Sequence, residues 1–288
     1  MATGAEPLSG ESKPSTGIPW QAAVWFLFLL IVCYAPVLAR LVRQWYDDAD
    51  MGHGFFVPIV AGYIAWKRRE ELAAPSLSWW GLGVVLWGAL QLMVATLGAE
   101  LFLARTAFII SLAGVVATLG GLRWLRVLAF PLFLLCFMVP IPAILYNQIT
   151  FPMQLFASQV ADFALSALGI PVLREGNILE LASQRLNVVE ACSGIRSLLS
   201  LSFLSLVYAW FFDRKVWMRF VLLAATLPIS ILANASRVTL TGIASEYDPD
   251  LASGVFHYLS GWVIFMVALV LLIGFHQVVN FAHRRIRG

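Results

Sequence analysis

Charged residues are scarce in this sequence of 288 residues. Lysine, arginine, aspartate and glutamate make up 12% of it, and 60% of the residues are hydrophobic. Ordinary soluble domains carry roughly 25% charged residues. A soluble fold of this length could not bury so much apolar surface, so its solvent must be lipid. The composition excludes a disordered chain, a secreted disulfide scaffold and a nucleic-acid-binding protein.

Cysteine is also scarce, with three residues in the chain. Cys33 and Cys136 fall inside long apolar runs, where small buried thiols are common. This pattern excludes a disulfide framework and offers no zinc-binding spacing, and nothing else in the sequence requires a cofactor. Cys192 differs because it lies in a polar segment that contains glycine.

A cleavable signal peptide is not expected. The first 17 residues are polar and rich in serine, proline and glycine, and the apolar run that follows is too long for a signal peptide. We therefore expect residues 1–17 to form a disordered cytoplasmic N-terminus and residues 18–288 to form a single membrane domain.

The apolar runs predict about eight transmembrane helices, because about 20 apolar residues cross a bilayer as a helix. An all-α membrane protein follows. The predicted spans are 18–39, 54–66, 79–99, 101–121, 125–142, 195–212, 216–240 and 255–280.

The region 143–191 differs from the spans and predicts a small extracytoplasmic cap. Residues 150–169 have apolar positions at helical spacing, which predicts an amphipathic helix at the membrane interface. Residues 177–190 alternate as two short strands of a β-hairpin around Ala182–Gln184. The polar positions expected off the apolar face of the helix are Gln154, Ser158, Gln159 and Asp162.

Basic clusters set the predicted orientation, because each follows an even-numbered span and all therefore fall on one side. The positive-inside rule makes that side the cytoplasm, with both termini on it. We expect a multi-pass membrane protein. The clusters are Lys67-Arg68-Arg69, Arg123 with Arg126, Arg214-Lys215 with Arg219, and Arg284-Arg285 with Arg287.

Cys192 is a candidate nucleophile at the start of the sixth span. A thiol at a helix N-terminus feels the positive end of the helix dipole, and the nearby Arg196 adds positive charge. Both favour the nucleophilic thiolate. Gly194 would let a substrate approach closely, and nearby backbone N–H groups could form an oxyanion hole. The simpler alternative is a small residue that packs at a helix start.

Two further candidates come from the last two spans. Arg237 lies within a membrane span, where arginine is costly and usually faces the protein interior or an aqueous cavity. Asn234 precedes it by three residues and shares its helix face. His257 opens the eighth span on the outer side and could act as the acid and base beside a cysteine. The alternatives are an arginine that snorkels to the interface and a histidine that is only a polar anchor.

The remaining histidines have weaker functional patterns. His53 follows an acidic run at the outer mouth of the second span, and acids with a histidine can bind a metal. A second cluster of ligands is missing, so we do not expect a metal there. His276 and His283 fit the role of polar anchors on the inner side.

The sequence resembles the exosortase/archaeosortase family of polytopic membrane cysteine transpeptidases, in particular its bacterial exosortase branch. The resemblance covers residues 20–280. It rests on ordered motifs, each modest alone and specific together: Ala191-Cys192-Ser193-Gly194-Ile195-Arg196, Asn234-Ala235-Ser236-Arg237-Val238, His257 with Gly261 and Trp262, and His53-Gly54 with Trp66 and Arg68-Arg69.

The resemblance implies a catalytic site of Cys192, Arg237 and His257, supported by Arg196, Asn234 and His53. It implies substrates that are membrane-anchored proteins with a C-terminal sorting signal of a Pro-Glu-Pro-like motif, an apolar helix and a basic tail. Such an enzyme cleaves near the motif and transfers the protein to an acceptor. An alternative is a membrane acyl- or glycosyltransferase of envelope or exopolysaccharide assembly, which would depend on a histidine or aspartate. A transporter would show polar groups at mid-membrane and repeats, and a structural subunit would tolerate change at all three positions.

Overall fold

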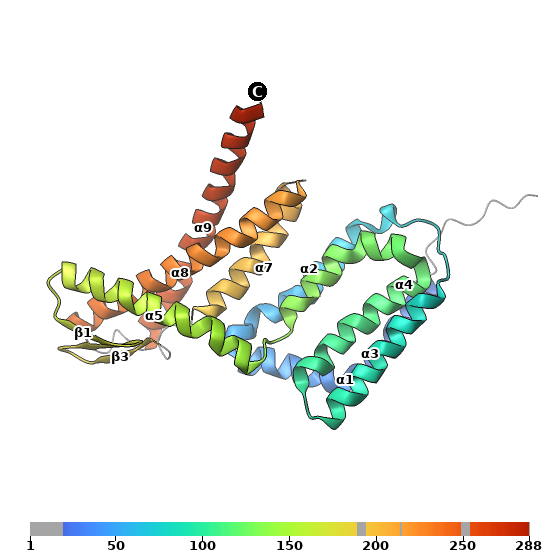
Figure 1. Ribbon diagram of the computed structural model, residues 1–288, viewed down its shortest axis with the longest axis horizontal. Coiled ribbons are helices and arrows are strands. Elements are labelled where there is room, and N and C mark those ends of the chain that lie inside the picture. The colour runs from blue at the N-terminus through green and yellow to red at the C-terminus, as the bar shows by residue number, and fades with distance from the viewer. Residues whose placement is uncertain (1–19, 189–193, 214, 249–253, 288) are drawn as a thin grey trace, which may run out of the picture. The chain divides into compact units, whose positions relative to one another are not determined.

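The computed structural model describes residues 20–188, 194–213, 215–248 and 254–287, with the backbone alone for residues 254–258 and 287 (Figure 1). This part of the chain forms two compact units. The first contains the chain up to residue 41 and residues 61–136, and the second contains residues 42–60 and the chain from residue 137 onwards. The predicted N-terminal segment 1–17 lies outside the described residues, and the single membrane domain stays a prediction.

Helices dominate both units, and one small sheet interrupts them. In chain order the elements are α1 (Trp20–Asp47), the 3-10 helix η1 (Ala49–Phe55), α2 (Phe56–Lys67), η2 (Arg69–Glu71), α3 (Trp79–Leu97), α4 (Leu101–Leu134), η3 (Leu135–Met138), α5 (Ala143–Ala167), β1 (Val172–Glu175), β2 (Ile178–Leu181), β3 (Arg185–Asn187), α7 (Ile195–Phe212), α8 (Val216–Tyr247) and α9 (Gly254–Arg287).

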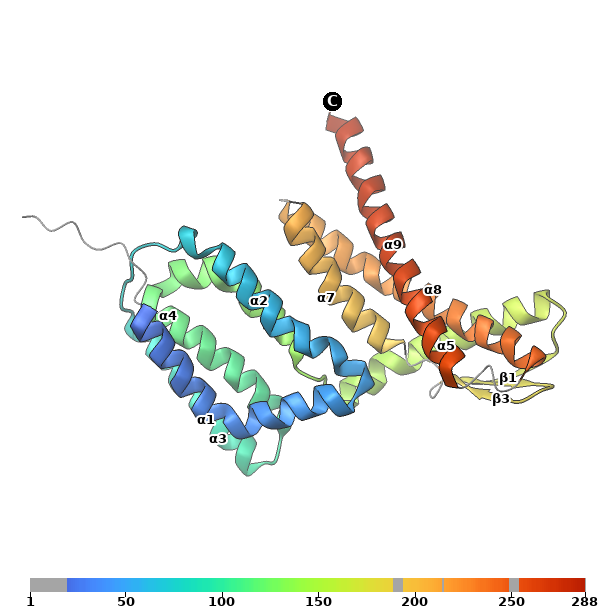
Figure 2. The ribbon, with the colours of Figure 1, turned by 180° about the vertical axis from the view of Figure 1, so that it is seen from behind.

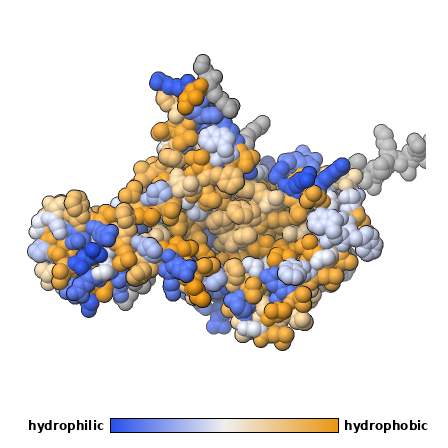
Figure 3. Space-filling view, viewed as in Figure 1, coloured by the Kyte–Doolittle hydropathy of each residue, from blue (hydrophilic) through white to orange (hydrophobic). Residues whose placement is uncertain are grey.

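Six helices in the described residues are long and apolar enough to cross a membrane. Their outer surfaces are apolar: on α1, Trp25 is 64% exposed and Phe28 is 54% exposed. Figure 3 shows hydrophobic side chains over much of the visible face. A soluble protein does not leave such continuous apolar surface in water. The chain is therefore an all-α, multi-pass membrane protein, as its composition predicts.

The predicted number of eight spans is not confirmed, for two reasons. Helix α2 has 12 residues, which is about 18 Å and short of a bilayer core. The predicted spans 101–121 and 125–142 form one bent helix, α4, which continues into η3. The bend lies at Gly121, whose φ of 63° and ψ of −158° are not helical.

The bend in α4 exposes backbone carbonyl groups that the preceding loop satisfies. Leu119 O and Thr118 O would normally accept hydrogen bonds from the next turn of the helix. They accept instead from Ser76 N at 3.1 Å and Ser78 N at 3.0 Å. The loop between α2 and α3 thus stabilises the bend.

The first unit is held together by close contact between α3 and α4, which pack along their lengths. A Cβ on Gly81 would lie 2.3 Å from Thr118 N, and one on Gly114 would lie 2.7 Å from Val85 N. Only glycine permits this backbone approach. Tyr34 joins α1 to the pair, because its hydroxyl lies 2.8 Å from Ser111 Oγ and donates to Gly88 O at 3.3 Å.

In the second unit, α7, α8 and α9 pack around a shared apolar core (Figure 2). The predicted sixth span, 195–212, coincides with α7. Helix α8 continues past its predicted end at residue 240 to Tyr247. The fully buried residues of this core are Leu201, Ala209, Met218, Leu222 and Leu272.

The predicted cap is present and has one strand more than expected. Strands β2 and β3 match the predicted hairpin, and β1 adds an antiparallel strand, in the order β1-β2-β3. The β1–β2 turn contains Gly176, with a φ of 65°, where glycine is favoured. A second apolar core joins the sheet to α5 and α8, and its members include Ala157, Leu165, Leu179, Val188 and Val238.

Helix α5 confirms the predicted helix but not its predicted faces. Gln154 and Ser158, expected off the buried face, are 5% and 0% exposed. The reason is tertiary: Ser158 Oγ donates to Gly176 O at 2.8 Å, and Asn177 Nδ2 donates to Gln154 Oε1 at 3.3 Å. Phe163 is 77% exposed on the other side, so these two polar residues share the buried face of α5 with Ala157 and Leu165.

Candidate functional site

The segment that leads into α7 makes a sharp turn at Gly194. Its φ is 72°, which is favourable only for glycine among common residues. A Cβ at Gly194 would lie 3.2 Å from Asn234 Cγ and 3.2 Å from Met153 Cε. Cys192, two residues earlier, lies outside the described residues. The start of α7 is therefore held between α5 and α8, close to the predicted nucleophile in sequence.

Helix α8 presents two predicted site residues on one face. Asn234 is 5% exposed and meets Gly194, as described above. Arg237, one turn further, approaches α9: a Cβ on Gly261 would lie 3.3 Å from the Cζ and Nη2 atoms of Arg237. The side chain of His257 is not among those the structure describes, but its backbone lies in α9, four residues before Gly261.

Arg196 forms an ion pair with the segment before α2. Its Nε donates to Asp50 Oδ1 at 3.0 Å. The second oxygen of Asp50, Oδ2, accepts from the hydroxyl of Tyr146 at 2.9 Å. The pair joins η1, α5 and α7, and about half of the Arg196 side chain (49%) remains exposed. The exposed part of Arg196 can thus meet an anionic group of a ligand.

His53 lies on the same short helix as Asp50. Its Nε2 donates to Phe137 O at 3.1 Å. Burial lowers the pKa of His53 below its ordinary value, and the hydrogen bond to Phe137 opposes this only in part. His53 is therefore neutral at pH 7 and joins η1 to η3. The structure does not bring it to Asn234 or Arg237 by any described contact.

The acidic run before His53 has a structural role. Asp48 caps η1, because its Oδ1 accepts from Asp50 N at 2.9 Å, and Asp50 binds Arg196. Among the residues that the structure describes, no group of three or more histidine, cysteine, aspartate or glutamate side chains is placed to hold a metal ion.

A groove of about 660 Å³ runs along α5 beside Tyr146, the residue that binds Asp50. Its lining is uncharged and rich in side-chain amides, from Asn147, Gln148, Gln154 and Asn177. Amide side chains offer both donors and acceptors, so this surface can hydrogen-bond the main chain of an extended peptide.

The other cationic residues of the cap have acidic neighbours within it. Arg174 Nε lies 3.8 Å from Asp162 Oδ2, and Arg185 Nε lies 3.4 Å from Glu180 Oε1. The turn between β2 and β3 is tied to the end of α8 by Ser183, whose Oγ donates to Glu246 at 2.7 Å. These contacts fix the sheet on α8. Arg196 differs from Arg174 and Arg185 because it lies in the first turn of α7.

Sequence reasoning missed Tyr146, Met153 and the pairing of Asp50 with Arg196. The polar run Tyr146-Asn147-Gln148 after apolar residues is a signal that could have indicated a polar surface at the start of α5. No local signal predicts that a carboxylate 146 residues away pairs with Arg196.

His276, which the sequence predicts to be a polar anchor, is buried in a hydrogen-bonded cluster. It is 6% exposed, with Nδ1 3.0 Å from the hydroxyl of Tyr208 and Nε2 3.2 Å from Asp213 Oδ2. Burial raises the pKa of Asp213, but hydrogen bonds from Lys215 N, His276 and Asn280 outweigh it, so its pKa is below the ordinary value. This cluster lies at the α7–α8 turn, at the opposite end of α7 from Gly194.

The fold defines a polytopic helical membrane protein with a small three-stranded sheet, in which Asn234 and Arg237 of α8 lie against the start of α7 and against α9. The model of the transmembrane exosortase family matches residues 45–274. The chain belongs to this family. No curated protein and no solved structure matches it.

Proposed function

We propose that the protein is a membrane-embedded cysteine transpeptidase that cleaves C-terminal sorting signals of exported proteins and transfers them to an acceptor. Its site is Cys192, Arg237 and His257. The substrates are membrane-anchored proteins with a signal of the Pro-Glu-Pro-like kind. The enzyme lies in the bacterial inner membrane with both termini in the cytoplasm, and its site faces the extracytoplasmic side.

One observation carries this proposal: a single face of α8 meets both segments that bear the other predicted catalytic residues. Asn234 contacts Gly194, two residues from Cys192, and Arg237 approaches Gly261, four residues from His257. Membership of the exosortase family agrees with this site.

The chemistry follows from the residue types. The Cys192 thiolate attacks the scissile carbonyl carbon, and the guanidinium of Arg237 stabilises the negative charge that develops on the carbonyl oxygen. His257 in its protonated form gives its proton to the leaving amine as the C–N bond breaks, which leaves a thioester. Neutral His257 then removes a proton from the acceptor nucleophile, which attacks the thioester and releases the thiolate.

Arg196 and the groove along α5 supply substrate binding in this scheme. Asp50 fixes the Nε edge of Arg196, so the other edge of the guanidinium is oriented for a carboxylate of the sorting motif. The amides of the groove hold the main chain beside that carboxylate. A substrate helix approaches through the lipid, and its motif reaches this end of α7 and α8.

The experiment is a processing assay. A tagged protein with a sorting signal is co-expressed with the wild-type enzyme, and precursor and product are separated on a gel. Cys192→Ala should abolish processing, and Arg237→Gln should lower its rate by about 10²- to 10³-fold. Cys33→Ala, which removes an exposed thiol of α1, serves as the matched control and should process at the wild-type rate.

Equal processing by the wild type and by Cys192→Ala would remove the proposed nucleophile. Processing that depends on His257 but not on Cys192 would favour the transferase alternative.

A further inference from the structure

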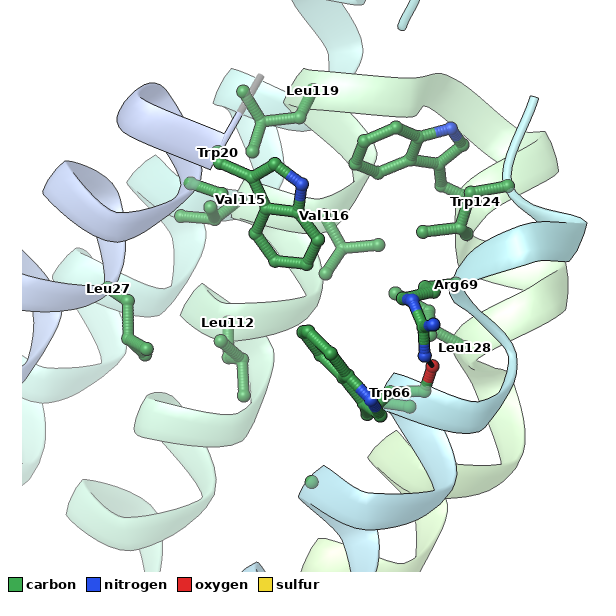
Figure 4. Close-up of a pocket in the computed structure, with 14 residues that line it drawn as sticks. Trp20, Leu27, Trp66, Arg69, Leu112, Val115, Val116, Leu119, Trp124 and Leu128 are labelled. Atoms are coloured by element: carbon green, nitrogen blue, oxygen red, sulfur yellow. Dashed lines mark hydrogen bonds between the residues drawn. The ribbon is translucent and has the colours of Figure 1, made fainter. Parts of the chain in front are cut away.

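The first unit contains an apolar groove of about 370 Å³, on residues that the proposed reaction does not use (Figure 4). Three tryptophans line it, Trp20 from α1, Trp66 from α2 and Trp124 from α4. Aliphatic side chains line much of the rest, among them Leu27 from α1 and Leu112 and Val116 from α4 (Figure 4).

The bend at Gly121 creates this groove. Lining residues come from α4 on both sides of the bend, up to Leu119 before it and from Trp124 after it. Trp124 is 3% exposed, and its Nε1 donates to Ala73 O at 2.9 Å. The wall is therefore fixed by hydrogen bonds of the backbone and the indole.

Arg69 brings a cation to this apolar groove. Its guanidinium carbon lies 4.3 Å from the centroid of the Trp66 ring, and its Nη1 donates to Trp66 O at 3.0 Å. Its acidic neighbour Glu70 is 3.3 Å away, but that side chain is 82% exposed, so water screens the pair strongly. Figure 4 shows Arg69 beside Trp66 at the groove.

The surrounding chain adds positive charge. Arg68 pairs with Glu71 and also donates to Val127 O at 2.6 Å, which places the end of α2 beside the second arm of α4. Lys67 in α2 and Arg123 and Arg126 in α4 have no acidic partner among the described residues. The groove is thus apolar inside, with the cation Arg69 in its lining and further basic residues in the adjoining segments 67–68 and 123–126.

We propose that this groove binds an anionic membrane phospholipid, with an acyl chain against the tryptophans and the phosphate at Arg69. Tryptophan prefers the level of the lipid headgroups, and basic pockets between membrane helices favour anionic headgroups. A zwitterionic lipid fits the apolar groove but carries no net negative charge to complement Arg69.

Native mass spectrometry of the full-length protein in detergent tests the proposal. The probes are dioleoylphosphatidylglycerol, dioleoylphosphatidylcholine and free glycerol 3-phosphate. We expect one phosphatidylglycerol molecule to be retained, with an affinity about fivefold higher than that for phosphatidylcholine, because one cation near the surface contributes about that factor. Arg69→Gln should remove this preference, whereas Arg285→Gln, which removes another cation stacked on an aromatic ring, should keep it.

Filling the groove gives an independent readout. A Cβ at Gly62, which lines the groove, meets nothing within 4 Å, so Gly62→Leu should fold and displace the lipid. Gly83→Leu on α3 has the same free space outside the groove and should retain it, and equal melting temperatures of the two variants confirm folding. Three results would each overturn the proposal. They are equal affinity of the wild type for both lipids, equal lipid retention by the two leucine variants, and binding of glycerol 3-phosphate as tight as that of phosphatidylglycerol.

Discussion

Replacing Gly194 by alanine tests whether the turn before α7 positions the site. The residue has a φ of 72°, where an alanine costs about 1–2 kcal/mol. The new Cβ would also lie 3.2 Å from Asn234 Cγ and from Met153 Cε. Either these side chains or the segment that carries Cys192 must move by a few tenths of an ångström.

Gly176 provides a control that separates strain from crowding. Its φ of 65° imposes a similar penalty, but a Cβ there meets nothing within 4 Å. Both alanine variants should therefore lose about 1–2 kcal/mol of stability, measured by thermal unfolding in detergent. Only Gly194→Ala should disturb the site.

The processing assay reads out the difference. Misplacement of reacting groups by 1 Å can cost about 10²-fold in rate, so the smaller shift expected for Gly194→Ala should slow processing about tenfold or more. Gly176→Ala should process at the wild-type rate once amounts of folded protein are matched. If Gly194→Ala processes as fast as Gly176→Ala, the turn does not position the nucleophile and the reasoning fails.

Three further predictions concern other parts of the second unit. Gly261→Ala should slow processing, because the new Cβ crowds the guanidinium of Arg237. Gly274→Ala on the same helix meets open space and should process at the wild-type rate. Equal rates for the two variants would contradict this prediction. Removing either partner of the ion pair Asp50–Arg196 should raise the substrate concentration needed for half-maximal processing. A double-mutant cycle on thermal stability should give a coupling of about 1 kcal/mol at most, since Arg196 is half exposed. Additive effects of the two substitutions on both readouts would argue against the pair. Asp213→Asn should destabilise the protein by about 1–3 kcal/mol at pH 7. This loss of stability should vanish as the pH falls through the lowered pKa of Asp213 in the folded state, because the carboxylate stabilises the fold only while it is ionised. A loss of stability that is unchanged at pH 3 would refute this.

Elements with a periodic pattern were predictable from the sequence. The sixth span and the strands of the cap follow from apolar runs and alternation, which depend only on neighbouring residues. The strand β1 was missed although it is as long as β2, because it lies before the alternating segment 177–190 that predicted the hairpin. The burial of Gln154 and Ser158 was also missed, because their partners Asn177 and Gly176 lie in the β1–β2 turn, which the sequence of the helix does not indicate.

The sequence alone also determined the class of protein, since scarce charge and long apolar runs require lipid as solvent. Its motifs predict Cys192, Arg237 and His257 as site residues, and Gly194 and Gly261, two and four residues from Cys192 and His257, both meet α8.

Only the tertiary structure decided that Asp50 pairs with Arg196 and that His276 is buried on Asp213. It also decided that the bend at Gly121 opens a groove beside Arg69. These features join residues far apart in the chain, and their energies come from burial and hydrogen bonds that exist only after the helices have packed.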